Sequence, residues 1–205
     1  MAGADDDRRD HPYTVGPWTV TAEETVYDNP WIRVIDHKVR HPNGAPGQYG
    51  LVHFKNRAIG VLAIDQDGFA PLVGQFRFPL NRYSWEVPEG GGPLKDDPLD
   101  AAQRELAEET GFIAGQWLEL ARFDVSNSVT DEESVCFLAW DLTPGAPAPE
   151  ESEQFAYDRV RFSALHDRVL SGEIRDALTI IMVLKAWRLA QAGNLPPDVC
   201  ALLGV

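Results

Sequence analysis

Cysteine is scarce in this sequence. Only Cys136 and Cys200 occur among 205 residues, and their spacing matches no common metal-binding pattern. A disulfide framework and a structural zinc site are therefore not expected, and a reducing compartment fits best. The N-terminal stretch MAGADDDRRD is acidic and lacks the apolar core of a signal peptide. We therefore expect a cytoplasmic protein.

Basic residues and long apolar runs are also few. The chain has 32 acidic against 18 basic residues and a formal net charge of -14. Such a surface repels nucleic acids and anionic membranes, so neither is expected as a partner. The most apolar stretch, residues 178–184, stops at Lys185 and falls short of the roughly 20 residues that a membrane helix needs. An anionic small-molecule ligand would require a local reversal of the electric field.

Segments rich in Val, Ile and aromatic residues dominate the chain and indicate strands. Strands are predicted at residues 18–27, 31–39, 48–55, 57–64, 69–78, 84–88, 116–125, 134–142 and 155–162. Helices are predicted from Pro98 to a stop at Gly111 and over residues 176–191. This is an α+β pattern in which few helices cover many strands.

Three regions follow from these patterns. Residues 1–12 are predicted to be a disordered tail, residues 13–57 an N-terminal β-sheet region, and residues 58–205 the main domain with C-terminal helices. A Pro-rich stretch at 143–153 is expected to be a surface linker.

The segment RELAEETG places Glu105, Glu108 and Glu109 within about 100° of one helix circumference. Like charges at this spacing repel each other, so the cluster destabilises the helix unless another interaction compensates for it. A solvated acidic face is one interpretation, and a site for a hard divalent cation is the other. The glycines at 90–92, just upstream, would let the backbone pass close to a ligand and favour the cation site.

Gly90, Asp96 and the run from Arg104 to Phe112 resemble the signature of the Nudix hydrolases. Every fixed position of that signature matches except Asp96, where the family has glutamate. The shorter carboxylate either braces the loop or weakens a metal contact. The resemblance implies a Nudix fold, a mixed β-sheet sandwiched by helices.

The resemblance also implies a cofactor and its ligands. Mg²⁺, with Mn²⁺ as a possible substitute, would clamp the diphosphate, polarise phosphorus and help to generate the attacking hydroxide. By position, Glu105 and Glu109 would be the principal ligands, Glu108 an auxiliary one and the Glu89 carbonyl a further one. Arg104 would orient the carboxylates.

From residue 18 to residue 189 the layout is similar to the ADP-ribose pyrophosphatase group, which carries an extra N-terminal antiparallel sheet. The segments GQFRFPLNRYSWEVPEGG and SGEIRDALTIIMVL carry this wider resemblance. It implies that Arg77 faces a phosphate or the terminal ribose, with Arg82 and Glu86 as further substrate-side residues. Each of the three could instead be structural, Arg77 as a surface ion pair.

The loop SNSVTDEES falls where this group carries a catalytic glutamate, and Glu132 is the best positional match. Its neighbours Asp131 and Glu133 could substitute, and a plain polar hairpin is the alternative. Asn127 stands where ADP-ribose members often have proline.

The predicted reaction is hydrolysis of a nucleoside diphosphate sugar, with ADP-ribose giving AMP and ribose 5-phosphate. GDP-mannose or a UDP-sugar is the alternative substrate, and a non-catalytic nucleotide-sugar sensor the alternative function. The resemblance also implies a homodimer.

Overall fold

The computed structural model describes residues 10–145 and 156–205, which form two compact units. The N-terminal unit comprises Met1–Lys55 and Val125–Glu132, and the larger unit comprises Asn56–Asp124 and Glu133–Val205. Most of the predicted tail and of the predicted linker lies outside the described residues.

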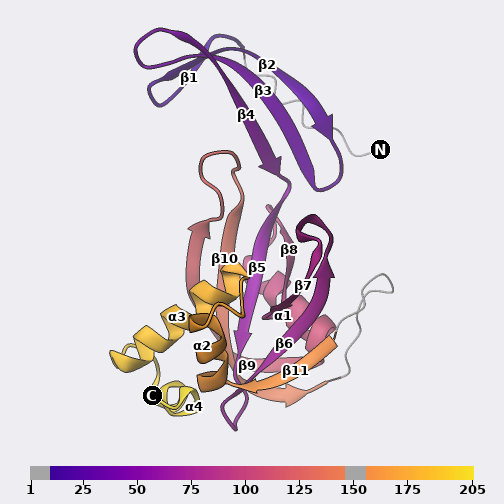
Figure 1. Cartoon of the computed structure of the whole chain (residues 1–205), viewed down its shortest axis with the longest axis vertical. Helices are drawn as coiled ribbons and strands as arrows, with labels where there is room; N and C mark the ends of the chain where they lie inside the picture. The colour runs from indigo at the N-terminus through magenta and orange to yellow at the C-terminus, as the bar shows by residue number, and fades with distance from the viewer. Residues whose placement is uncertain (1–9, 146–155) are drawn as a thin grey trace. The chain divides into compact units, whose positions relative to one another are not determined.

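The N-terminal unit contains one antiparallel sheet of four strands in the order β1-β2-β3-β4 (Figure 1). Its strands are β1 (Tyr13–Val15), β2 (Trp18–Asp28), β3 (Ile32–Arg40) and β4 (Pro46–Phe54). Of the hydrophobic side chains on these strands, only Val20 and Val39 are buried. The predicted N-terminal antiparallel sheet is confirmed, and it has little core of its own.

The larger unit is built on a mixed sheet with the strand order β8-β5-β10-β9. Its strands are β5 (Asn56–Ala63), β8 (Glu89–Pro93), β9 (Phe112–Asp124) and β10 (Glu133–Pro144). β5 and β10 run parallel, and the other neighbours are antiparallel. β8 was not predicted, because its sequence EGGGP has little strand propensity; pairing with β5 overrides that preference.

A second sheet and four helices complete this unit. The sheet has the order β11-β6-β7, with β6 (Phe69–Arg77), β7 (Arg82–Glu86) and β11 (Ala156–Arg161), and the short 3-10 helix Phe78–Leu80 joins β6 to β7. The helices are α1 (Pro98–Thr110), α2 (Phe162–Leu170), α3 (Ala177–Gln191) and α4 (Pro197–Leu203).

Side chains along β5 alternate between the two faces of the sheet, and they belong to two separate hydrophobic cores. Ile59 and Val61 point to the face covered by α1, where they pack with Leu106. Leu62 points to the opposite face, in the core that contains Met182 of α3. A sheet buried on both faces needs apolar residues at consecutive positions, as β5 has. The predicted sheet between helices, and with it the α+β fold class, is confirmed.

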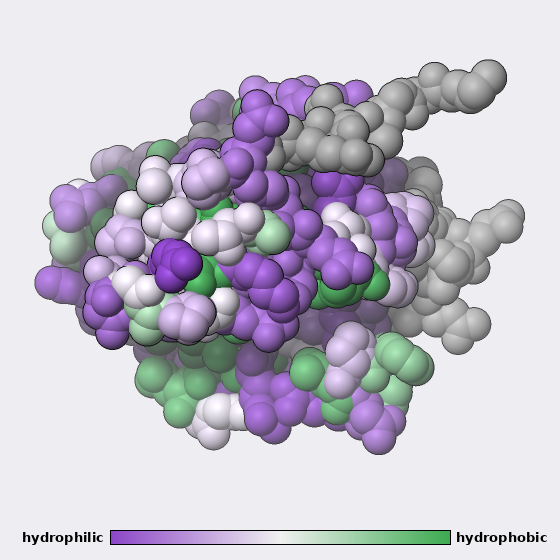
Figure 2. All heavy atoms as spheres, turned by 90° about the horizontal axis from the view of Figure 1, so that it is seen from above, coloured by the Kyte–Doolittle hydropathy of each residue, from purple (hydrophilic) through white to green (hydrophobic). Residues whose placement is uncertain are grey.

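Hydrophilic residues cover much of the face shown in Figure 2, in keeping with the large excess of acidic side chains. Among the helices in the described segments, none is both long enough and apolar enough to span a bilayer.

Candidate active site

Helix α1 is fixed at both ends by its sequence. Asp97 is the N-cap, and its side chain accepts a hydrogen bond from the Leu99 N–H at 3.0 Å. Gly111 ends the helix in the left-handed region at φ 73°, and its N–H donates to the Ala107 carbonyl. Because Leu106 is fully buried, the edge of α1 that carries Glu105 and Glu109 runs beside the sheet.

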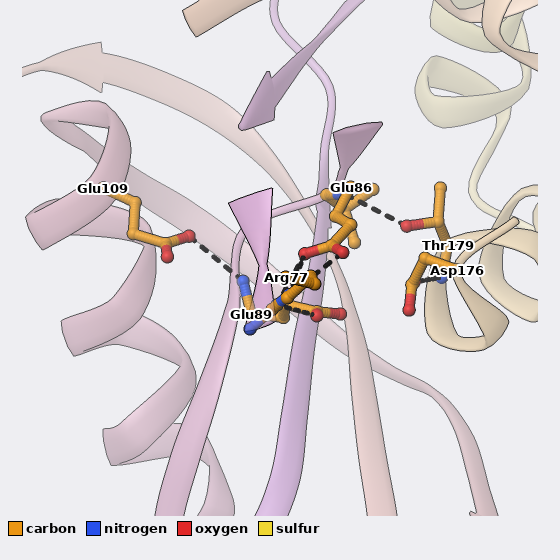
Figure 3. Close-up of polar contacts among 7 residues, drawn as sticks. Arg77, Glu86, Glu89, Glu109, Asp176 and Thr179 are labelled. Atoms are coloured by element: carbon orange, nitrogen blue, oxygen red, sulfur yellow. Dashed lines mark hydrogen bonds and ion pairs between the residues drawn. The ribbon is translucent and has the colours of Figure 1, made fainter. Parts of the chain in front are cut away.

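The carboxylates of α1 meet the backbone of β8. A Cβ at Gly90 would lie 2.2 Å from the Glu105 Cδ, so only glycine leaves room for this side chain. Glu109 accepts a hydrogen bond from the Glu89 N–H at 3.1 Å (Figure 3). The glycine-rich strand and the glutamate-rich helix are therefore in direct contact through Glu105 and Glu109.

Arg104 holds two of the predicted ligands. Its Nη2 donates to Glu105 Oε1 at 2.7 Å and to the Gly91 carbonyl at 3.0 Å, and its Nη1 donates to Glu108 Oε2 at 2.7 Å. Burial would lower the pKa of Arg104, but Glu105 and Glu108 raise it above its ordinary value. This geometry suits a residue that orients carboxylates.

These residues fit a hard divalent cation. Glu105, Glu108, Glu109 and the nearby backbone carbonyls supply only oxygen ligands, which Mg²⁺ prefers. The space that a Cβ at Gly90 would fill is already used to admit the Glu105 carboxylate. Asp96, which replaces the glutamate of the signature, is exposed in the turn before α1. Its N–H donates to the Pro93 carbonyl, and its carbonyl accepts from Arg57 Nη1.

A second group of charged residues lies around Arg77 (Figure 3). Arg77 donates from Nε and Nη2 to Glu86, with a shortest distance of 2.5 Å, and from Nη2 to Glu89 Oε1 at 2.5 Å. Burial would lower the pKa of Arg77, but the two glutamates raise it. Glu86 is only 3% exposed, so its carboxylate accepts the Arg77 hydrogen bonds inside the protein. Arg82 faces Arg77 across the β6–β7 pair.

Asp176 and Thr179 belong to this second group, and the sequence did not single them out as site residues. Asp176 caps α3 by accepting from the Thr179 N–H at 2.7 Å, and Thr179 Oγ1 accepts from the Val87 N–H at 3.0 Å (Figure 3). The helix-capping pattern Asp-x-x-Thr was the available signal. It predicts a helix start but no contact with β7 and β8.

Carboxylate oxygens of Glu86, Glu89 and Asp176 lie within 4.8 Å of one another. Burial raises the pKa of Asp176. Burial, Asp176 and Glu86 hold the pKa of Glu89 well above its ordinary range. The Glu89 Oε2 is buried and has no hydrogen-bond partner in the described part of the chain. Three carboxyl groups thus share the guanidinium of Arg77, and their closeness disfavours ionisation of all three together.

The three acidic residues of the loop before β10 differ in their surroundings. Glu133 pairs with Arg57 at 2.9 Å and with Arg122 at 3.2 Å in the larger unit. Asp131 pairs with His53 in the N-terminal unit. Glu132 is half-buried, and its carboxylate has no hydrogen-bond or ion-pair partner among residues 10–145 and 156–205. Burial and then Asp131 raise its pKa. Of the three carboxylates, only that of Glu132 is uncommitted.

Two family models match the chain. The NUDIX domain matches residues 54–177, and the nucleoside diphosphate sugar hydrolase N-terminal domain matches residues 18–52. The chain is 34% identical over 161 residues to an ADP-ribose pyrophosphatase of Bacillus subtilis, covering 77% of this chain and 86% of the relative. It is 31% identical over 167 residues to an ADP-ribose pyrophosphatase of Mycobacterium tuberculosis, covering 80% of each.

A solved structure supports the same fold. The crystal structure of an ADP compounds hydrolase superposes with a TM-score of 0.75 at 21% identity, covering 87% of this chain and 97% of the other. The Nudix domain spans more than half of the chain and includes the residues at which α1 meets β8. The chain therefore belongs to the Nudix hydrolases, enzymes that act on pyrophosphate bonds.

Proposed function

We propose that this protein hydrolyses the diphosphate linkage of a nucleoside diphosphate sugar, with ADP-ribose as the substrate. Water adds across the P–O–P bond, and the products are AMP and ribose 5-phosphate. The observation that carries the proposal is the packing of Glu105 against Gly90, with Glu109 on the Glu89 N–H. The two relatives named ADP-ribose pyrophosphatase and the matching N-terminal domain support the choice of substrate.

Each site residue has a role in this proposal. Glu105 and Glu109, with Glu108 and the Glu89 carbonyl, hold Mg²⁺, for which Mn²⁺ can substitute. When bound, the cation neutralises diphosphate charge and makes phosphorus more electrophilic. Arg104 keeps the carboxylates of Glu105 and Glu108 in position.

Glu132 accepts the proton of the attacking water, a role that suits a carboxylate with a raised pKa and no competing partner. Arg77, which Glu86 holds in place, donates from Nη1 to a phosphate oxygen or the terminal ribose, since that nitrogen makes no hydrogen bond within the described segments. Arg82 supports substrate binding from the neighbouring strand.

The substrate assignment can be tested with a panel of anionic nucleotides. The full-length protein with Mg²⁺ would be given ADP-ribose, GDP-mannose, UDP-glucose, NADH and dGTP, with added phosphatase releasing phosphate from monoester products. Preference for ADP-ribose supports the proposal. Preference for GDP-mannose or UDP-glucose keeps the reaction and replaces the substrate. Binding without turnover, also with Mn²⁺, would identify a sensor.

We also propose that the protein is a cytoplasmic homodimer. The N-terminal sheet buries little of its own surface, and Trp31 is 65% exposed. A hollow of about 310 Å³ on the same sheet is lined by Trp18, His37, Tyr49 and several aliphatic side chains. A sheet normally buries one apolar face against another layer of the fold. A second copy of the chain would supply that layer here. Light scattering should then give twice the chain mass of 22.7 kDa. The free thiols of Cys136 and Cys200 fit a reducing compartment.

A further inference from the structure

The loop Val125–Glu132 completes the edge of the N-terminal sheet. β4 is the last strand of that sheet, so one side of its backbone would otherwise be unpaired. The Val52 N–H donates to the Val129 carbonyl at 2.9 Å, and Val52 and Thr130 form a parallel bridge. The Tyr49 hydroxyl donates to the Ser128 carbonyl at 2.6 Å. The loop is therefore part of the N-terminal unit, although it immediately precedes β10 in the chain.

Asp131 is the side-chain anchor of this arrangement. One of its carboxylate oxygens lies 2.6 Å from His53 Nδ1, and the other accepts from the Phe54 N–H at 2.9 Å. Both partners stand at the C-terminal end of β4. Two hydrogen bonds to one carboxylate, from a ring and from the backbone, fix its position and orientation. Asp131 is thus engaged in holding the loop.

Asp131 is adjacent in the sequence to Glu132, the proposed proton acceptor, whose carboxylate must be placed precisely. Glu132 follows Asp131 directly and is half-buried. Its carbonyl accepts a hydrogen bond from the Val125 N–H at 3.1 Å, whereas its carboxylate has no hydrogen-bond or ion-pair partner among the described residues. Its own side chain therefore does nothing to fix the loop. Within the N-terminal unit, the position of Glu132 depends on the bond from the Val125 N–H, on the backbone bonds between the loop and β4, and on Asp131.

We propose that His53 and Asp131 form a positioning pair that fixes the loop carrying Glu132, so that the N-terminal sheet contributes to turnover. This inference rests on the proposed function, in which Glu132 accepts the proton of the attacking water. In this proposal His53 and Asp131 act through Glu132, as positioning residues. Loss of either should leave substrate affinity intact and lower the rate of the chemical step.

Hydrogen–deuterium exchange on the full-length protein without substrate tests the anchor itself. His53→Leu and Asp131→Ala remove the pair. His53→Asn keeps a nitrogen donor near the place of Nδ1. Asp36→Ala is the control, because it removes side-chain bonds to Lys38 and Gln48 on the same sheet. We expect faster exchange in residues 126–132 and at the Phe54 amide in the first two variants only.

Kinetics on the same variants tests the consequence. A misplaced catalytic group commonly costs roughly 10²-fold in rate. We expect kcat to fall by this order in His53→Leu and Asp131→Ala with KM unchanged. We expect the double variant to be no worse than either single variant, and His53→Asn to recover much of the loss.

The possible outcomes separate the two proposals. Unchanged exchange in the loop, or faster exchange with unchanged kcat, overturns the positioning pair. A rise in KM with kcat unchanged also overturns it, because it indicates a role in binding. A wild-type protein that cleaves no diphosphate sugar overturns the proposed function and, with it, the catalytic consequence, and the exchange comparison alone then decides whether the anchor exists.

Discussion

At the scale of single residues, the site depends on how closely side chains approach the backbone of β8. Gly90 and Gly91 are neighbours in this strand but have different surroundings. A Cβ at Gly90 would fall 2.2 Å from Glu105 Cδ, whereas one at Gly91 would have only ordinary contacts, the nearest 3.5 Å from Asn56 Nδ2. Glycine is thus required at one position and merely tolerated at the other.

Gly90→Ala should therefore disable the site without unfolding the protein. The displaced atoms are the end of a flexible side chain, so Glu105 moves and the strand remains. We expect cation affinity and turnover to fall by roughly 10- to 100-fold, as when ligand-orienting contacts are lost. Mn²⁺ titration followed by electron paramagnetic resonance would measure the affinity. Gly91→Ala is the matched control, and wild-type affinity in Gly90→Ala would contradict the assignment of Glu105.

Glu89 should make stability depend on pH. Burial, Asp176 and Glu86 raise the pKa of its carboxyl, so the folded state binds this proton more tightly than the unfolded state does. Stability from the bound proton is complete below the ordinary glutamate pKa of about 4.3 and is lost as pH rises through the raised value. At neutral and alkaline pH, folding therefore opposes ionisation of Glu89.

Glu89→Gln should then stabilise the folded state at pH values above the range in which Glu89 loses its proton. The amide cannot ionise, and its N–H groups can donate to the neighbouring carboxylates. We expect the free energy of unfolding to exceed that of the wild type by about 1–3 kcal/mol at pH 8, the scale of an unsatisfied buried polar group. Urea unfolding at pH 8 and pH 5 without divalent cations would show it, with the exposed Glu24→Gln as control. An equal difference at both pH values would refute the explanation.

At the scale of elements, helix α1 was predictable and strand β8 was not. Asp97, Pro98 and Gly111 mark the ends of α1 with local signals, and Leu106 sets its buried face. β8 has no local signal, because EGGGP becomes a strand only through pairing with β5. Likewise, a capping pattern marks Asp176, but its place beside Glu86 and Glu89 depends on tertiary packing.

The N-cap of α1 should contribute stability and little else. Asp97→Ala removes the acceptor of the Leu99 N–H, and such losses cost about 1 kcal/mol. Chemical denaturation should show this decrease, while turnover of the folded protein stays near the wild-type value, since the cap is at the opposite end of α1 from Glu109. Asp97→Asn keeps an acceptor and should be close to wild type. A large loss of turnover in Asp97→Ala would show that the cap also shapes the site.

At the scale of the whole molecule, acidity and an anionic substrate have to be reconciled. The net charge of -14 opposes binding of a diphosphate. If the carboxylates of α1 hold a cation, the positive charge of that cation attracts the diphosphate locally and offsets this repulsion. The signature made this part of the site predictable. The loop was not: only the structure shows that Asp131 is held by His53, some 78 positions earlier in the chain.

The proposed function is that the carboxylates of α1 support hydrolysis of a nucleoside diphosphate sugar. Its most direct test is chromatography of the products of ADP-ribose and Mg²⁺, with the wild type, Glu109→Gln and Asp100→Asn compared in parallel. Asp100 is an exposed acid in the first turn of the same helix and serves as the control. We predict equal amounts of AMP and ribose 5-phosphate from the wild type and Asp100→Asn, and almost none from a folded Glu109→Gln. Turnover by Glu109→Gln near the wild-type rate would contradict the account.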